Sequence, residues 1–277
     1  MLNIYYINLE SAIERRIAIE KNLNQFLMSG ATVNRVSAFD AKYVHKHEIA
    51  GSIRNTEKAC FLSHMKAIEM SLLQPGPALI IEDDISLGPQ SISQIKDLLG
   101  KASIGIDLLF AEMCISSLSS MFQLYMLKRE LLRDNKIEVL QTQLFDFAGA
   151  TAYILNHQSK SKLLKIMQKI KSFDLPYDLV LKQLILNGDI SSGFIFPFVA
   201  TLTGNSLNTD IQLEADELPN VVYHSFRKLM YLDTQENMAN YLNDLEKIPK
   251  NFYSQEDLVF GKIISTVMSE KFPISMF

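Results

Sequence analysis

Three consecutive acidic residues, Glu82, Asp83 and Asp84, follow a run of four apolar residues at positions 78–81. A Pro-Gly-Pro turn precedes this run, which predicts a short buried strand that ends at the acids. Adjacent carboxylates at the end of a buried strand are costly unless a positive group meets them. Mn²⁺ or Mg²⁺ would meet them through oxygen and be shared with a substrate phosphate. From spacing alone, a solvated acidic turn is the alternative interpretation.

Strands and helices alternate along the chain that carries this motif. Composition predicts strands at 4–9, 33–40, 78–81, 106–113, 150–156 and 193–200. Helices are predicted at 56–73, 159–171 and 176–187, and a capping box of Ser11 and Glu14 predicts an earlier one. This order predicts an α/β domain with a mainly parallel central sheet. Ligands of such sheets bind beyond the carboxyl ends of the strands, where Asn8, Asp40 and the acidic triplet are expected.

The first predicted helix places an arginine on its inner face. Its apolar stripe consists of Ile13, Ile17, Leu23 and Leu27. At helical spacing Arg16 falls on that stripe, while Arg15 points away. An arginine on an inner face needs an anionic partner, which is either a phosphate or a carboxylate such as Asp40 or Glu57.

Composition limits the class of protein. The chain has 277 residues, of which 48% are hydrophobic, and a net charge of −4, which argues against a general nucleic-acid-binding surface. Cys60 and Cys114 are too few for a disulfide framework, so we expect a reduced, cytoplasmic protein. No signal peptide and no membrane-spanning apolar run is apparent. Residues 212–277 carry 10 acids and 6 bases, an imbalance that suggests a boundary near 212.

Five stretches occur in an order that resembles glycosyltransferase family 25, the lipooligosaccharide galactosyltransferases and their collagen-modifying relatives. They are IYYINLESAIERR, RVSAFDAK, EKACFLSH, ALIIEDDI and GATAYILN. The resemblance covers roughly residues 3–211. It implies a GT-A type, Rossmann-like nucleotide-binding domain at 1–211, followed by a helical extension at 212–277. It also implies an inverting hexosyltransferase of bacterial lipooligosaccharide or surface polysaccharide synthesis, with a divalent metal and a UDP-sugar, most often UDP-galactose.

The resemblance assigns roles to the acidic triplet. It implies Asp84 as a metal ligand and Glu82 as a ligand or a group facing the ribose or a metal-bound water. Asp83 is a weaker donor-site candidate, because neighbouring strand residues point to opposite faces. The motif begins with Glu82 where other members have Asp, and Ala59 stands where many have Gly.

Other positions of the family pattern are expected around the donor. Asn8 and Leu9 match its INL, with a nucleoside contact or a turn as alternatives. Arg16 matches its second arginine, and Asp40 is either a uracil or ribose contact or a helix cap. The helix positions that match are Glu57, Ser63 and His64. They are expected either to bind donor sugar or pyrophosphate or to be structural.

Asp178 resembles the acid of the family's Pro-x-Asp, and it is expected to be the catalytic base or an acceptor contact. Its place in the first turn of a helix equally suits an acid that complements the helix dipole. Asp210 is a candidate near the metal or donor, and His224 is a candidate late metal ligand by analogy with other GT-A enzymes.

The expected partners are a UDP-sugar donor and a glycan or lipid-linked glycan acceptor. The predicted helix at 159–171 carries five lysines, which are Lys160, Lys162, Lys165, Lys169 and Lys171. They form either a solvated face or a weak contact to the cytoplasmic face of the inner membrane. A non-catalytic glycan- or nucleotide-binding relative is the rival hypothesis, and a metal-dependent nucleotidyltransferase or phosphohydrolase is a third. The sequence does not determine the oligomeric state.

Overall fold

The computed structural model of the chain describes residues 2–101, 105–203, 217–233, 242–243, 246 and 254–267. The chain divides into two compact units, residues 1–236 and 237–277. Helix α8 (Glu217–Leu229) belongs to the first unit and α10 (Gln255–Val267) to the second. The predicted division into a catalytic domain at 1–211 and a helical extension at 212–277 concerns function as well as packing, and it stays a prediction.

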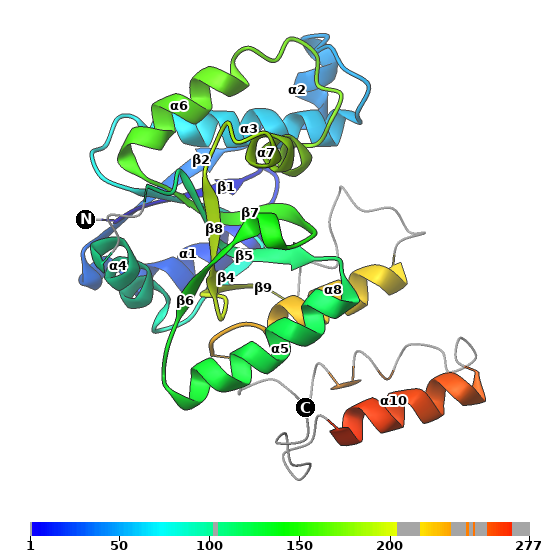
Figure 1. Ribbon diagram of the computed structural model, residues 1–277. Helices are drawn as coiled ribbons and strands as arrows, with labels where there is room; N and C mark the ends of the chain where they lie inside the picture. Colours follow the sequence, from blue (N-terminus) through cyan, green and yellow to red (C-terminus); the bar gives the residue numbers. More distant parts are fainter. Residues whose placement is uncertain are drawn as a thin grey trace. The chain divides into compact units, whose positions relative to one another are not determined.

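The first unit is built on a seven-stranded sheet in the order β2-β1-β3-β7-β5-β8-β6, with a small second sheet of β4 and β9 (Figure 1). The strands are β1 (Leu2–Asn8), β2 (Ala31–Ser37), β3 (Ala78–Glu82), β4 (Ile85–Leu87), β5 (Leu108–Ile115), β6 (Glu138–Gln141), β7 (Phe147–Leu155), β8 (Ser192–Phe196) and β9 (Ala200–Leu202). In the large sheet, β7 and β6 run antiparallel to their neighbours. The other five strands share one direction, which confirms the predicted α/β class with a mainly parallel sheet.

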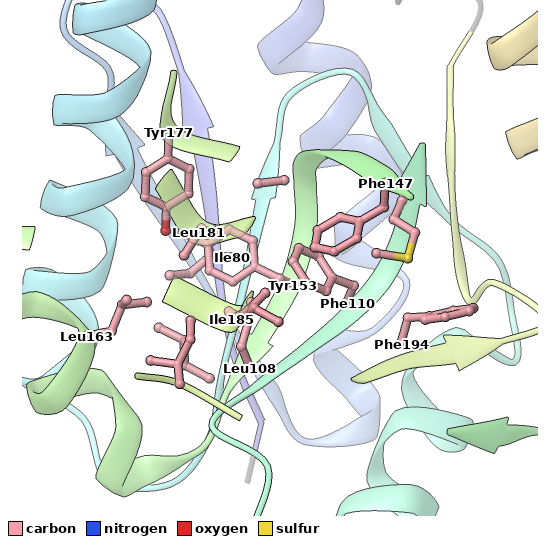
Figure 2. Packing of buried hydrophobic residues seen from close by; sticks show 14 of the residues in the cluster. Ile80, Leu108, Phe110, Phe147, Tyr153, Leu163, Tyr177, Leu181, Ile185 and Phe194 are labelled. Atoms are coloured by element: carbon pink, nitrogen blue, oxygen red, sulfur yellow. Dashed lines mark hydrogen bonds between the residues drawn. The ribbon is translucent and has the colours of Figure 1, made fainter. Parts of the chain in front are cut away.

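Each face of the sheet has its own apolar core, because successive strand residues point to opposite faces. Tyr5 belongs to one core together with Ile80 and Phe110, the last two of which are labelled in Figure 2. Ile4 and Ile81, which neighbour Tyr5 and Ile80, belong to the other core. The first core packs against α3 (Asn55–Ser71), α5 (Leu118–Arg133), α6 (His157–Met167), α7 (Tyr177–Leu186) and α8. The second packs against α1 (Ile13–Asn24) and α4 (Ser91–Lys101). The short α2 (Ala41–Lys46) follows β2.

The inner face of α1 differs from the predicted stripe. The helix begins at Ile13, and its N-cap residue Ala12 makes no side-chain cap, so the predicted Ser11 capping box is absent. Ile19 and Leu23 are buried, whereas Ile13 and Ile17 are more than half exposed. The inner face is therefore rotated relative to the prediction, and this rotation changes which arginine faces the sheet.

The reversed direction of β7 gathers side chains at one edge of the sheet. Ile81 near the end of β3 pairs with Ala152, and Glu112 within β5 pairs with the same residue, while Ile115 at the end of β5 pairs with Phe147. The beginning of β7, with Gly149 and Thr151, consequently lies beside the carboxyl ends of β3 and β5. This edge is where ligands of mainly parallel sheets bind.

Gly51 ties together the loops that lead into α3 and α7. The Phe173 N–H donates to the Ala50 carbonyl at 3.0 Å, and the Ile53 N–H donates to the Phe173 carbonyl at 3.3 Å. Gly51 has φ +133°, and a Cβ atom there would lie 2.1 Å from the Phe173 carbonyl oxygen. Only glycine suits both this backbone conformation and this close approach.

We predict that Gly51→Ala lowers the free energy of unfolding by roughly 2 to 5 kcal/mol, because strain and overlap with backbone add together. Urea denaturation measures the change. Gly100→Ala is the matched control, because nothing lies within 4 Å of a Cβ atom at that position in α4. It should be neutral or stabilise by up to about 1 kcal/mol. Equal effects of the two substitutions would contradict the tie between the loops.

Candidate active site

The acidic triplet lies at the end of β3, in the tight connection to β4. Glu82 is the last residue of β3, and Asp83 and Asp84 form the turn before Ile85. The exposed fractions of Asp83 and Asp84 are only 8% and 6%. The alternative of a solvated acidic turn is therefore wrong, and each carboxylate needs a partner.

Asp83 finds its partners within the protein. Its Oδ2 accepts a hydrogen bond of 2.6 Å from Asn8 Nδ2 and lies 3.5 Å from Arg15 Nε. Burial raises the pKa of Asp83, and the Asn8 hydrogen bond and the Arg15 charge act in the opposite direction. Asn8 also accepts from Arg35 Nε at 3.2 Å. Asp83 thus joins β1 and α1 to the acidic turn.

The predicted placement of Arg16 on the inner face is wrong, because Arg15 is the arginine that meets the acidic turn. The predicted contact of Arg16 with a phosphate stays a prediction. Arg16 Nη1 instead lies 3.9 Å from the exposed Glu10, and no ion pair links it to Asp40 or Glu57. The rotated inner face of α1 explains the exchange. The prediction that Arg16 faces inward and Arg15 outward relied on an apolar stripe that included Ile13 and Ile17, and both of these residues are exposed.

Glu82 faces His64 on α3. His64 Nε2 lies 3.3 Å from Glu82 Oε1, and His64 Nδ1 lies 3.1 Å from the Tyr153 hydroxyl. The Tyr153 hydroxyl is 2.8 Å from that of Tyr177, whose ring stacks on His64 at a centroid distance of 4.3 Å. Burial opposes ionisation of Glu82, but the hydrogen bond and charge of His64 outweigh it and lower the pKa of Glu82.

Asp84 is the carboxylate that the described protein leaves unsatisfied. Its Oδ1 is buried and has no hydrogen-bond partner among the described residues. Its backbone carbonyl accepts from the Thr203 N–H at 2.7 Å, which fixes the turn against the strand end of β9. Burial, followed by the charge of Glu82, raises the pKa of Asp84 to about 7. A buried acceptor of this kind fits a cation ligand.

Two donor sets could hold a metal. The oxygen atoms of Asp84 and Glu82 are hard ligands that suit Mn²⁺ or Mg²⁺. Cys60 Sγ, a ring nitrogen of His64 and an oxygen of Glu82 also lie within 4.8 Å of one another, and this mixed set suits a softer ion. Burial, and then the negative charge of Glu82, raises the pKa of the Cys60 thiol well above its usual value. A neutral thiol makes the oxygen set the better candidate.

A buried ion pair that sequence reasoning missed lies at the same edge. Arg227 of α8 donates from Nε to Glu112 Oε2 at 2.6 Å and from Nη2 to Glu112 Oε1, while Thr151 bonds to both side chains. Burial opposes the charge on Arg227, but Glu112 outweighs it and raises the arginine pKa. The signal in the sequence was a single Glu inside the apolar run LLFAEM, a position that needs a buried partner.

Asp178 lies at this edge with one oxygen engaged. Its Oδ2 accepts from the Gly149 N–H at 2.8 Å, a direction that φ +82° at Gly149 permits. Gly149 lies near the beginning of β7, where Ala148 pairs with Cys114 of β5, so Asp178 lies beside this part of β5. The predicted role of Asp178 as a base stays a prediction.

Several residues that were predicted to contact the donor make hydrogen bonds within the protein. The Leu9 carbonyl accepts from Ala12, and Asp40 caps α2 by accepting from the Tyr43 N–H at 2.7 Å. Glu57 accepts from the Arg54 N–H at 2.9 Å in a capping box at the start of α3, two turns from His64. Ser63 accepts from the Phe39 N–H at 2.9 Å. These bonds support the structural alternatives without testing donor binding.

The remaining predicted positions are less informative. Asp210 lies outside the described residues. His224 is buried on α8, and burial, with the nearby Arg227 and Lys228, lowers its pKa to about 4. Neutral histidine can bind a metal, and the group of three potential ligands found among the described residues, Cys60, His64 and Glu82, does not include His224. Its predicted metal role stays a prediction.

The lysine-bearing face of α6 is smaller than predicted. Lys160 is fully buried and donates to the carbonyls of Ser71 and Gln74, so it caps the end of α3 and cannot contact a membrane. Lys162 pairs with Asp107 at 2.7 Å. Among the described helices, none combines the length and apolarity that crossing a bilayer requires.

A known protein family and several solved structures are similar to this chain. No curated protein matches the chain. Solved structures with similarity include mouse xyloside xylosyltransferase 1 (TM-score 0.38, 11% identity, 69% of this chain and 71% of that chain). They also include the Streptococcus pneumoniae glycosyltransferase GlyE (0.36, 10%, 69% and 44%) and Mycobacterium tuberculosis glucosyl-3-phosphoglycerate synthase with Mn²⁺, UDP and phosphoglyceric acid (0.32, 12%, 70% and 67%). The model of glycosyltransferase family 25, described as an LPS biosynthesis protein, matches residues 1–181, and the chain therefore belongs to this family.

Proposed function

We propose that this glycosyltransferase is metal-dependent and inverting, and that it moves a hexose, galactose by family analogy, from a UDP-sugar to a hydroxyl of a glycan acceptor. The observation that carries the proposal is the buried Oδ1 of Asp84 at the carboxyl edge of the sheet, which has no hydrogen-bond partner in the described part of the chain. Family membership supports sugar transfer, and the oxygen ligands of Asp84 and Glu82 support a hard cation.

The neighbouring residues prepare the donor site. A divalent cation bound by Asp84 and Glu82 would supply positive charge to the leaving diphosphate. Asn8 and Arg15 hold Asp83 and so fix the backbone of the acidic turn. The stack of Tyr177 on His64 holds the imidazole against Glu82. Rigid support of this kind keeps Glu82 oriented before the donor arrives.

Asp178 is the residue that we assign as the base. Inversion requires one displacement, in which the acceptor oxygen attacks the anomeric carbon, the bond to the diphosphate breaks and the acceptor proton leaves. Oδ2 of Asp178 accepts from Gly149, and Oδ1 has no hydrogen-bond partner among the described residues. A carboxylate fixed through one oxygen can take the proton on the other.

The rival hypothesis is a non-catalytic relative that binds glycan or nucleotide. Asp84 argues against it, because a buried carboxylate without a partner destabilises a protein that has no cation to bind. A binding module would gain stability by replacing this residue. A nucleotidyltransferase shares the acids and the cation, and the transferred group distinguishes it.

The cellular setting follows the same proposal. We assign the acceptor to bacterial lipooligosaccharide or surface polysaccharide, either free or lipid-linked, and the enzyme to the cytoplasm, with peripheral contact to the inner membrane. The family description as an LPS biosynthesis protein supports the acceptor class. Lys162, Lys165, Lys169 and Lys171 of the α6 region are exposed, and Lys162 is paired with Asp107, so the other three are the lysines that we assign to such a contact.

We predict that the purified protein releases UDP from one UDP-hexose in the presence of Mn²⁺, and that EDTA abolishes the release. Asp84→Asn should lower the rate by at least 100-fold, because it removes a charged cation ligand. Chromatography with mass detection should show sugar in the product. No turnover of any UDP-sugar with any of Mn²⁺, Mg²⁺ or Co²⁺ and a lipooligosaccharide acceptor would refute the proposal, and transfer of nucleotide would favour the third hypothesis.

A pH-dependent stability follows from Asp84. Burial raises its pKa in the folded protein to about 7, above the ordinary value of 3.8, so its ionisation destabilises the fold progressively as pH rises from 4 to 7. In EDTA, the free energy of unfolding of Asp84→Asn should equal that of wild type near pH 4. Above pH 7 it should be higher than that of wild type by a few kcal/mol, at most about 4. Chemical denaturation across this range measures the difference. A difference independent of pH would show that Asp84 is not strained in the metal-free protein.

Asp178 gives a prediction that separates chemistry from binding. Asp178→Asn keeps an oxygen that can accept from Gly149 but cannot take a proton at neutral pH. We expect UDP-sugar affinity within threefold of wild type and transfer at least 100-fold slower. Calorimetry and the transfer assay give the two values. Asp174→Asn, an exposed acid in the preceding loop, is the control. Unchanged transfer in Asp178→Asn would remove this residue from the role of base.

A further inference from the structure

The stability of the fold does not explain why Arg227 and Glu112 form a buried ion pair. Glu112 is fully buried and Arg227 is 7% exposed. Pairs this deeply buried often contribute no more stability than apolar residues of the same size. The pair connects α8 to β5 and, through Thr151, to β7. It therefore calls for an explanation at the edge of the sheet that holds the acidic turn.

One nitrogen of the Arg227 guanidinium, Nη1, takes no part in the bonds to Glu112 and Thr151. Its Nε and Nη2 donate to Glu112, and Nη2 also donates to Thr151. Among the residues that the structure describes, Nη1 has no hydrogen-bond partner. A guanidinium held through two of its nitrogens presents the third in a fixed direction, which is how arginine binds phosphate.

Arg227 lies at the same edge of the sheet as the acidic turn. Its partner Glu112 pairs with Ala152 of β7, and Ala152 pairs with Ile81, the residue before Glu82. A ligand that binds both a cation at Asp84 and the Arg227 guanidinium would need one negatively charged group for each of them. The diphosphate of a sugar nucleotide meets this requirement.

We propose that Arg227 binds the diphosphate of the donor through Nη1, and that Glu112 and Thr151 are positioning residues that aim it. The proposal rests on the proposed function and adds a donor contact outside the residues that match the family model, 1–181. Helix α8 thereby becomes part of the donor site. Arg227 favours departure of the diphosphate, because its charge meets the negative charge that develops there.

Calorimetric titration with UDP and with uridine, in Mn²⁺ buffer, tests the assignment. Arg227→Gln alone strands the Glu112 charge, so the test variant is the double substitution Glu112→Gln with Arg227→Gln, which leaves a neutral, hydrogen-bonding pair. We expect 10- to 100-fold weaker UDP binding and unchanged uridine binding. Arg227→Lys keeps the charge and loses the fork, so it should give an intermediate loss of UDP affinity. Arg133→Gln, at the exposed end of α5, controls for loss of one positive charge.

The possible results distinguish failure of the Arg227 assignment from failure of the proposed function. UDP affinity equal to wild type in both the double variant and Arg227→Lys overturns the role of Arg227 and leaves the proposed function intact. Equal loss of UDP and uridine assigns Arg227 to the architecture of the site and also overturns the inference. Wild-type protein that does not distinguish UDP from uridine overturns both the inference and the proposed function.

Discussion

The burial of the Asp84 carboxylate, whose Oδ1 has no hydrogen-bond partner among the residues that the structure describes, is the constraint on which the rest of the site depends. The turn between β3 and β4 is short, and the Thr203 N–H donates to the Asp84 carbonyl, which fixes the backbone from which the buried side chain extends. A carboxylate in this position either takes a proton or binds a cation. The protein accepts a loss of stability here, as functional sites commonly do.

The surrounding elements each satisfy one neighbour of Asp84 and leave Asp84 itself unsatisfied. β1 and α1 supply Asn8 and Arg15 to Asp83, and α3 supplies His64 to Glu82. The reversed strand β7 brings Thr151 and the Gly149 N–H to the same edge, where α7 and α8 add an acid and an arginine. In the function that we propose, these groups would complement a cation, a leaving diphosphate and an acceptor hydroxyl.

The sequence predicted what depends on local pattern and missed what depends on topology. Alternating strands and helices predicted the sheet, and the acid run predicted the importance of the end of β3. The arginine assignment was wrong because a few apolar positions did not fix the rotation of α1, and Ile19 rather than Ile17 proved buried. Glu112 and Arg227 are 115 residues apart, and no local periodicity pairs them. The antiparallel insertion of β7 likewise depends on pairing between distant strands.

The most direct test of the account is the binding of Mn²⁺, followed by electron paramagnetic resonance at pH 8 in the presence of UDP. We expect one Mn²⁺ per chain in wild type, a loss of at least 30-fold in affinity for Asp84→Asn, and a smaller change for Asp83→Asn, since Asn8 and Arg15 already engage that carboxylate. Undiminished Mn²⁺ binding by Asp84→Asn would contradict the claim that this carboxylate is held for a cation.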